Sequence, residues 1–295
     1  MVRVSFTSLL ILVPLIVLAS TTAVYAVFRE EPCGKLIVGA DRTVQPILDE
    51  AIDLLLEESS VCKPRVVRDY GPTGIVWFKL DKASIFDIYG TISGYSLARA
   101  LDKGLVKEET LIVLGYADLL IYVREGNPQG VQGLRDLVLG KRGLIVAIPH
   151  PDYTAAGQII RAILEEAVDP DSGRSYWEIL HERHTVVYLF TAPKAVAYVR
   201  MGSADVGISF RTYYVVNPRG VSAVEIEKEL NTYVQPIAVA ITRYVSSREL
   251  AQKLMEILES DEVKKLVEKL GYIPSEKLRE LAPYAKVYGL EGRVK

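Results

Sequence analysis

The feature that most constrains this chain is a strand–loop–helix unit at residues 144–167. Residues 144–148 are five apolar residues in a row, the length and composition of a buried strand. The pattern breaks at residues 149–151, and apolar residues return at helical spacing over 159–164. The small residues of 154–157 allow a ligand to approach the backbone, and the first turn of a helix suits an anion. An ordinary strand–helix unit without a ligand is the alternative interpretation.

The same alternation continues through most of the chain. We expect strands at 36–39, 66–67, 85–89, 111–114, 119–123, 144–148, 186–190, 205–209 and 233–242. We expect helices at 48–56, 75–80, 96–103, 134–139, 159–164, 176–180, 191–201, 247–258 and 261–270. Strands that alternate with helices of this length indicate an α/β protein with parallel sheets and helices on both faces.

Several expected strand-to-helix turns carry a hydroxyl side chain. These are Thr43, Thr73, Thr154 and Thr191, and either Asp41 or Thr43 can cap the first helix. In open α/β sheets such turns gather at the carboxyl ends of the strands, where ligands bind. The pattern suits a small oxyanion held by hydroxyls and backbone N–H groups without a formal counter-charge.

The N-terminus has the pattern of an export signal. Arg3 precedes an uncharged, mostly apolar run at 9–28, and Ala26 is a small residue at which a signal peptidase could cut. The run is also long enough to span a bilayer. We therefore assign residues 1–28 to a signal peptide or a membrane anchor, and both interpretations place the rest of the chain outside the cytoplasm.

Composition narrows the function classes. The 35 basic and 37 acidic residues nearly cancel, so nothing indicates a nucleic-acid partner. The scarcity of Asn, Gln and Met leans towards a heat-adapted source. Cys33 and Cys62 form a disulfide in one interpretation of an exported chain and are unpaired thiols in the other. Cys33 follows REEP and lacks the small and apolar neighbours of a lipidation site.

Two other patterns contain residue types that occur in metal sites or in catalytic sites. His181 and His184 are three residues apart, which favours the end of a surface helix over a metal site, since the HExxH spacing is missing. His150 and Asp152 could be an acid–base pair of an exported hydrolase, but no serine nucleophile elbow accompanies them. We therefore expect no enzyme activity, no metal and no cofactor.

The order of motifs along the chain resembles one known family. The motifs are GADRT at 39–43, GPTG at 71–74, FDIY at 86–89, PDYTAAG at 151–157, GSADVGI at 202–208 and the closing helix at 258–271. Between residues 36 and 271 the chain resembles the periplasmic molybdate/tungstate-binding proteins of ABC importers, in the type II periplasmic-binding-protein superfamily.

The resemblance implies two Rossmann-like α/β lobes, joined by crossing strands near 117–123 and 233–240, with the ligand cleft between them. Lobe one would hold residues 35–117 and 237–295, and lobe two residues 118–236.

The resemblance also implies site residues. The first-loop serine of the family falls at Asp41 and the second-loop serine at Thr73. Backbone N–H donors to the oxyanion fall at Ala156 and Ala192, and the ligand tyrosine falls at Phe210.

Two of these positions depart from the family pattern. Asp41 places a carboxylate beside an anion, at a cost in affinity unless it caps the helix or pairs with Arg42. Phe210 cannot donate the hydrogen bond of a tyrosine. Arg42, Arg211 or Tyr213 could compensate.

These observations predict a monomeric solute-binding protein outside the membrane. It would deliver a small oxyanion, with molybdate or tungstate favoured, to an ABC permease and would be tethered to the membrane if the N-terminal segment is uncleaved. The alternatives are the ligand-sensing ectodomain of a membrane receptor, and a binding protein for a different anion or a small organic acid.

Overall fold

The computed structural model describes residues 34–59 and 63–290. The predicted signal or anchor segment at 1–28 and the predicted Cys33–Cys62 disulfide lie outside the described residues. Within the described ranges, no helix has the length and apolar character needed to cross a membrane.

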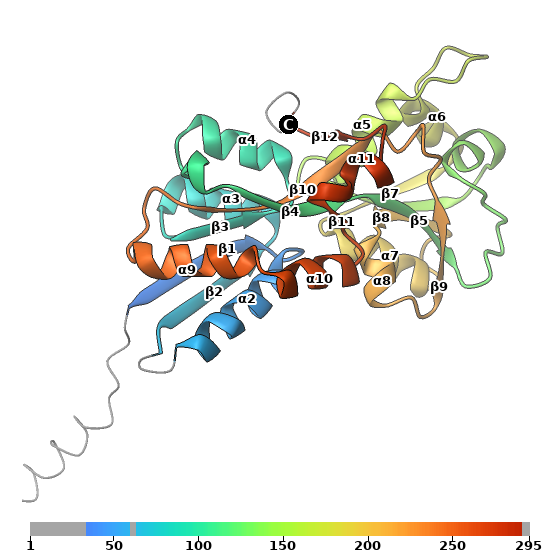
Figure 1. Cartoon of the computed structure of the whole chain (residues 1–295). Helices are drawn as coiled ribbons and strands as arrows, with labels where there is room; N and C mark the ends of the chain where they lie inside the picture. The colour runs from blue at the N-terminus through green and yellow to red at the C-terminus, as the bar shows by residue number, and fades with distance from the viewer. Residues whose placement is uncertain (1–33, 60–62, 291–295) are drawn as a thin grey trace, which may run out of the picture.

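Two mixed β-sheets organise two lobes, side by side in Figure 1. The first sheet has the order β11-β4-β10-β3-β1-β2, with β12 paired to β10. Its strands are β1 (Lys35–Asp41), β2 (Arg65–Gly71), β3 (Ile88–Thr91), β4 (Ile112–Ala117), β10 (Tyr233–Ile241), β11 (Ile273–Pro274) and β12 (Lys286–Val287). The second sheet has the order β7-β6-β8-β5-β9. Its strands are β5 (Leu119–Arg124), β6 (Ile145–Pro149), β7 (Thr185–Leu189), β8 (Val206–Phe210) and β9 (Val221–Glu225).

The predicted parallel pairing holds in only part of each sheet. β1 runs parallel to β2 and β3, and β6 runs parallel to β7 and β8. β10 is antiparallel to β3 and β4, and β5 is antiparallel to β8 and β9. The expectation of parallel sheets is therefore correct for these pairings, and it missed the antiparallel strands β5 and β10. β5 and β10 run antiparallel because each follows a connection between the lobes. That connection brings the strand into its sheet against the direction of the neighbouring strands.

The chain passes between the two sheets twice. Only Asp118 separates β4 of the first sheet from β5 of the second, and the return follows β9 and leads into β10. All nine residues of β10 are buried, including the polar Gln235. The Gln235 side chain joins the lobes, because it accepts from the Gly94 N–H at 3.0 Å and donates to the Ala155 carbonyl at 2.8 Å.

Helices surround the first sheet in Figure 1, where α3 and α4 lie in its upper part, and α2 packs against α9. The helices that follow first-sheet strands are α2 (Gln45–Glu58), α3 (Thr73–Phe78), α4 (Gly94–Asp102), α9 (Arg248–Leu258), α10 (Asp261–Lys269) and α11 (Leu278–Leu281). The helices of the second lobe are α5 (Ala155–Glu166), α6 (Tyr176–Arg183), α7 (Ala192–Arg200) and α8 (Thr212–Val216). Short helical turns η1 (Lys79–Ala83), η2 (Glu108–Thr110), η3 (Asp136–Gly140) and η4 (Ser275–Lys277) complete the set.

Most expected elements are present, with shifted ends. The third strand begins at Ile88 instead of residue 85, because the Asp87 carboxylate is occupied by the backbone of Ile37 and Ser246. Strand β9 was not predicted. It is an edge strand of five residues with the sequence VSAVE, which lacks the long apolar run of a central strand.

Candidate functional site

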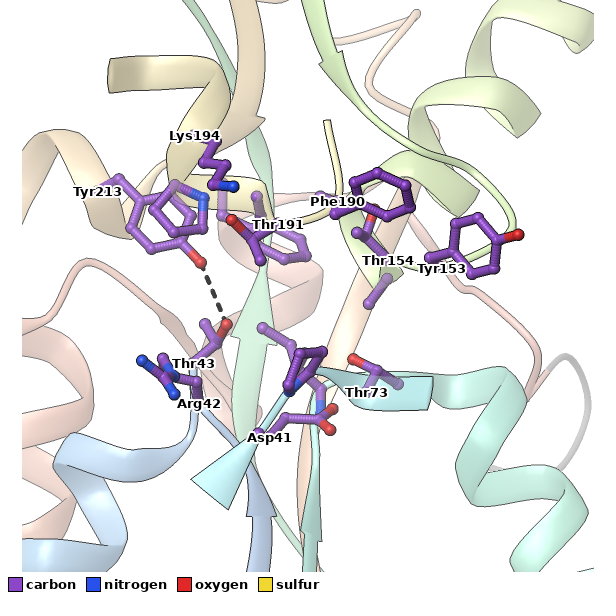
Figure 2. Close-up of a pocket in the computed structure, with 18 residues that line it drawn as sticks. Asp41, Arg42, Thr43, Thr73, Tyr153, Thr154, Phe190, Thr191, Lys194 and Tyr213 are labelled. Carbon is purple, nitrogen blue, oxygen red and sulfur yellow. Dashed lines mark hydrogen bonds between the residues drawn. The ribbon is translucent and has the colours of Figure 1, made fainter. Parts of the chain in front are cut away.

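A cavity of about 490 Å³ lies between the two lobes. In Figure 2 the first lobe contributes the lower wall, with Asp41, Thr43 and Thr73, and the second lobe contributes the upper wall. The lining residues follow the carboxyl ends of strands in both sheets, the position at which α/β sheets bind ligands. They are Asp41, Arg42, Thr43, Gly71, Pro72, Thr73, Ile92, Tyr153, Thr154, Ala155, Ala156, Phe190, Thr191, Ala192, Pro193, Lys194, Phe210 and Tyr213.

The structure brings all six residues predicted for the site to this one cavity. Three come from the first lobe and three from the second. They are Asp41, Arg42 and Thr73, and Ala156, Ala192 and Phe210. All six residues therefore lie in the wall of one cavity, and we predict that they contact the ligand.

The start of α5 presents free backbone donors to the cavity. Thr154 caps the helix, because its hydroxyl accepts from the Gly157 N–H at 3.0 Å and donates to the His150 carbonyl at 2.9 Å. Among the described residues, the N–H groups of Ala155 and Ala156 have no hydrogen-bond partner. A helix of 12 residues adds a partial positive charge at this end. Both N–H groups are therefore available to an anion.

The start of α7 provides a second set of donors. Thr191 occupies the N-cap position, but its hydroxyl makes no capping hydrogen bond. Within the described part of the chain, no partner is found for the Ala192 N–H. Lys194 lies in the first turn, where the helix dipole disfavours a cation. An anion in the cavity would offset the unfavourable interaction between the Lys194 ammonium and the helix dipole.

Asp41 ends β1, and neither of the two roles expected to neutralise it, helix capping or pairing with Arg42, is found. Its Oδ2 accepts from the Thr91 hydroxyl at 2.8 Å and from the Ile92 N–H at 2.9 Å, so it neither caps α2 nor forms an ion pair with Arg42. Burial raises the pKa of Asp41 to about 6, against the effects of Ile92, Thr91 and the nearby Thr73 hydroxyl.

Phe210 lies at the end of β8, buried in the wall of the cavity. Of the three residues expected to compensate for its missing hydroxyl, Arg42 and Tyr213 line the cavity and Arg211 does not. Arg211 is held by Asp118 at 2.6 Å and Glu225 at 2.7 Å. The expectation for Arg211 was therefore wrong, because an acidic pair beside the lobe crossing already holds its guanidinium.

Sequence reasoning missed several residues of the cavity wall. Lys194 could have been suspected from a cation in the first turn of a predicted helix. Tyr153 and Phe190 line the cavity with exposed rings, 53% and 66% accessible. Each follows the end of a strand, and nothing in the sequence distinguishes them from the other aromatic residues of the chain.

The two histidines of the 181–184 pattern lie in different environments. The expectation of a surface helix end was wrong for His184, which is buried between the Leu144 N–H and the Leu137 carbonyl. His181 is exposed and contacts the Trp177 carbonyl. In the described ranges, no group of three or more His, Cys, Asp or Glu residues could hold a metal ion.

Solved structures of known proteins share this two-lobed architecture. The sulfate-binding protein SubI from Mycobacterium tuberculosis H37Rv matches with a TM-score of 0.70 and 17% identity, over 85% of this chain and 93% of that chain. The periplasmic molybdate-binding protein of Azotobacter vinelandii matches with a TM-score of 0.62 and 15% identity, over 81% and 98%. The predicted type II periplasmic-binding-protein fold is confirmed.

Sequence comparison identifies the family. The chain is 22% identical over 207 residues to YvgL of Bacillus subtilis (strain 168), whose name describes an ABC transporter substrate-binding lipoprotein. The match covers 69% of this chain and 74% of YvgL. The model of the family "Bacterial extracellular solute-binding protein" matches residues 36–273. This chain therefore belongs to the bacterial extracellular solute-binding proteins, a family that binds solutes for ABC transporters and is not enzymatic.

Proposed function

We propose that the solute is a small oxyanion, bound in the cavity between the lobes and delivered to an ABC permease. The observation that carries the proposal is the convergence of unpaired donors on one cavity. The unpaired N–H groups belong to the first residues of two helices, Ala155 and Ala156 of α5 and Ala192 of α7. Arg42 and Lys194 add positive charge to the same cavity. Neutral N–H groups and cationic side chains together suit a tetrahedral anion.

The members of this class are ranked by resemblance. The motif order favours molybdate or tungstate, and the names of two structural neighbours indicate sulfate and molybdate binding in those proteins. Binding would proceed by closure of lobe one (35–117 and 237–295) on lobe two (118–236), with water expelled and the helix termini directed at the anion. The permease would then recognise the closed form.

Thermal unfolding in the presence of sodium molybdate, tungstate, sulfate or phosphate tests the proposal. A ligand at 100 times its Kd stabilises the folded state by about 2.7 kcal/mol, which raises the Tm of a chain of this size by about 5 °C or more. A flat response to all four anions, with a shift for a metal cation or a neutral sugar, would contradict an oxyanion site.

Thr73→Ala tests the location of the site. Removing the Thr73 hydroxyl should weaken binding of the responsive anion by about tenfold if the hydroxyl donates to it. Thr110→Ala is the matched control, because the Thr110 hydroxyl bonds the Lys107 carbonyl and does not line the cavity. Equal affinity in wild type and Thr73→Ala would count against this assignment.

A further inference from the structure

Asp41 is the residue that an oxyanion site does not explain. It is 1% exposed, lines the cavity and accepts hydrogen bonds from Thr91 and Ile92 through Oδ2. Its Oδ1 is buried and has no hydrogen-bond partner among the described residues. A buried acceptor without a donor is costly, so a donor brought by the ligand would satisfy it.

The donors close to Asp41 are neutral, since the Ile92 N–H and the Thr91 and Thr73 hydroxyls lower its pKa without adding a positive charge. The Tyr89 and Tyr213 hydroxyls are neutral, because desolvation raises the pKa of each. Arg42 and Lys194 line the same cavity, but no ion pair within 4.0 Å joins either to Asp41 in the described residues. At neutral pH the cavity therefore combines cationic and N–H donors with one carboxylate acceptor.

A fully deprotonated oxyanion meets this acceptor unfavourably. Sulfate and molybdate carry only acceptor oxygens at neutral pH. An oxygen of either anion placed against the Asp41 carboxylate would therefore be repelled, because neither group carries a proton to donate. One proton between the two groups turns that repulsion into a charge-assisted hydrogen bond. The proton can be brought by the ligand as an O–H group, or it can be taken up by Asp41 from solvent.

We propose that the site selects an oxyanion that carries its own proton, such as hydrogen phosphate, with Oδ1 of Asp41 accepting the ligand O–H. This inference rests on the proposed oxyanion function and assigns its substrate class, with a protonated oxyanion in place of the molybdate or tungstate that the motif order favours. The N–H groups of α5 and α7 bind the unprotonated oxygens, which any tetrahedral oxyanion offers. Asp41 supplies the element that repels the competing anions, so that discrimination follows from proton content and not from size.

Isothermal titration of the full-length protein at pH 8 with phosphate, sulfate and molybdate tests the selection. We expect phosphate to bind at least about 100-fold more tightly than sulfate, since a site built around a ligand hydroxyl strongly rejects analogues without it. Sulfate or molybdate binding as tightly as phosphate would overturn the inference and leave the oxyanion function standing. If none of the three anions binds, the proposed function itself fails.

The pH dependence of wild-type binding provides a second test that needs no variant. Sulfate requires Asp41 to take up a proton, so its affinity should rise about tenfold per pH unit as pH falls from 8 towards 6. Phosphate brings its proton, so its affinity should stay nearly constant from pH 7 to 8. Parallel curves for the two anions would overturn the inference. His150 packs beside Tyr153 and Phe190, and His150→Gln is the control that should leave both curves unchanged.

Asp41→Asn tests the residue. The asparagine oxygen can accept from Thr91 and Ile92 as Oδ2 does, which places the amide N–H₂ where Oδ1 is unpartnered. That N–H₂ donates to a fully deprotonated oxyanion, so the phosphate-to-sulfate ratio should fall at least about 30-fold. Asp87→Asn is the control, since this buried carboxylate lies outside the cavity. An unchanged ratio in folded Asp41→Asn would overturn the role of Asp41, and if the variant does not fold the pH series decides.

Discussion

The hydroxyl oxygens of Thr43 and Tyr213 lie 3.1 Å apart, one from each lobe (Figure 2). Tyr272 also binds the loop that contains Thr43, because its hydroxyl donates to the Thr43 carbonyl at 3.0 Å. The segment between β1 and α2 is therefore fixed by two tyrosines, of which Tyr213 lines the cavity. This contact couples the distance between the lobes to the position of Asp41 and Arg42.

Tyr213→Phe should weaken anion binding about three- to tenfold. The variant keeps the ring and removes the only hydroxyl that bonds Thr43 across the lobes in the described structure, a bond with a net value of about 1 kcal/mol. Titration calorimetry with the anion that stabilises the wild type measures the loss. Thr43→Val removes the same bond from the other side, so the double variant should bind no more weakly than the weaker single one. Additive losses would show that the two residues act separately.

Thr154→Ala should lower the free energy of unfolding by about 1 kcal/mol, because the cap of α5 is lost. Thr191→Ala is the matched comparison. Thr191 occupies the same position at α7 without a capping bond, so its loss should change stability by less than about 0.5 kcal/mol. Urea denaturation of both variants without ligand measures the difference. Equal losses would refute the assignment of the cap to Thr154.

The sequence was sufficient for the alternation of elements and for the turns that face the cavity. Apolar runs such as 144–148 and hydroxyl residues such as Thr154 are local signals, so β6 and the start of α5 could be read from neighbouring residues. The antiparallel strands could not be predicted from the periodicity of the strands. Their direction follows from connections between lobes, and local periodicity carries no information about direction.

The site was predictable only where a residue type has a fixed local role. The backbone donors at Ala156 and Ala192 follow from helix starts. The state of Asp41 depends on Thr91 and Ile92, about 50 residues away, and could not be read from its own neighbours. Arg211 seemed available for a ligand because Asp118 and Glu225 are distant in sequence and adjacent only in the fold.

Asp118→Ala should cost about 1–3 kcal/mol of stability. The carboxylate is almost fully buried where the chain crosses between the lobes, and its loss leaves Arg211 bound only by Glu225. The partial exposure of Arg211 places the cost below that of a fully buried pair. Glu165→Ala is the control, since it breaks the exposed pair with Arg161 and should cost less than about 0.5 kcal/mol. Chemical denaturation compares the two, and similar costs would contradict a structural role for the crossing pair.

Asp41→Asn should stabilise the ligand-free protein at pH 8 and have little effect near pH 4. The pKa of Asp41 is about 6 in the folded state and about 3.9 in an unfolded chain. Between these values the folded state binds more protons than the unfolded state, so the contribution of Asp41 to stability falls as pH rises from 4 to 6 and is constant above. The difference between the folded and unfolded pKa of Asp41 corresponds to a loss of up to about 3 kcal/mol in the free energy of unfolding at pH 8.

The measurement is the difference in unfolding free energy between wild type and Asp41→Asn across pH 4 to 8, which cancels the titration of all other groups. Asp87→Asn provides the comparison, because the Asp87 carboxylate accepts from Ile37, Ser246 and its hydroxyl and is fully used by the fold. That variant should be destabilised at pH 8. If Asp41→Asn is destabilised to the same extent there, Asp41 serves the fold as Asp87 does, and its unpaired oxygen is not held in reserve for a ligand.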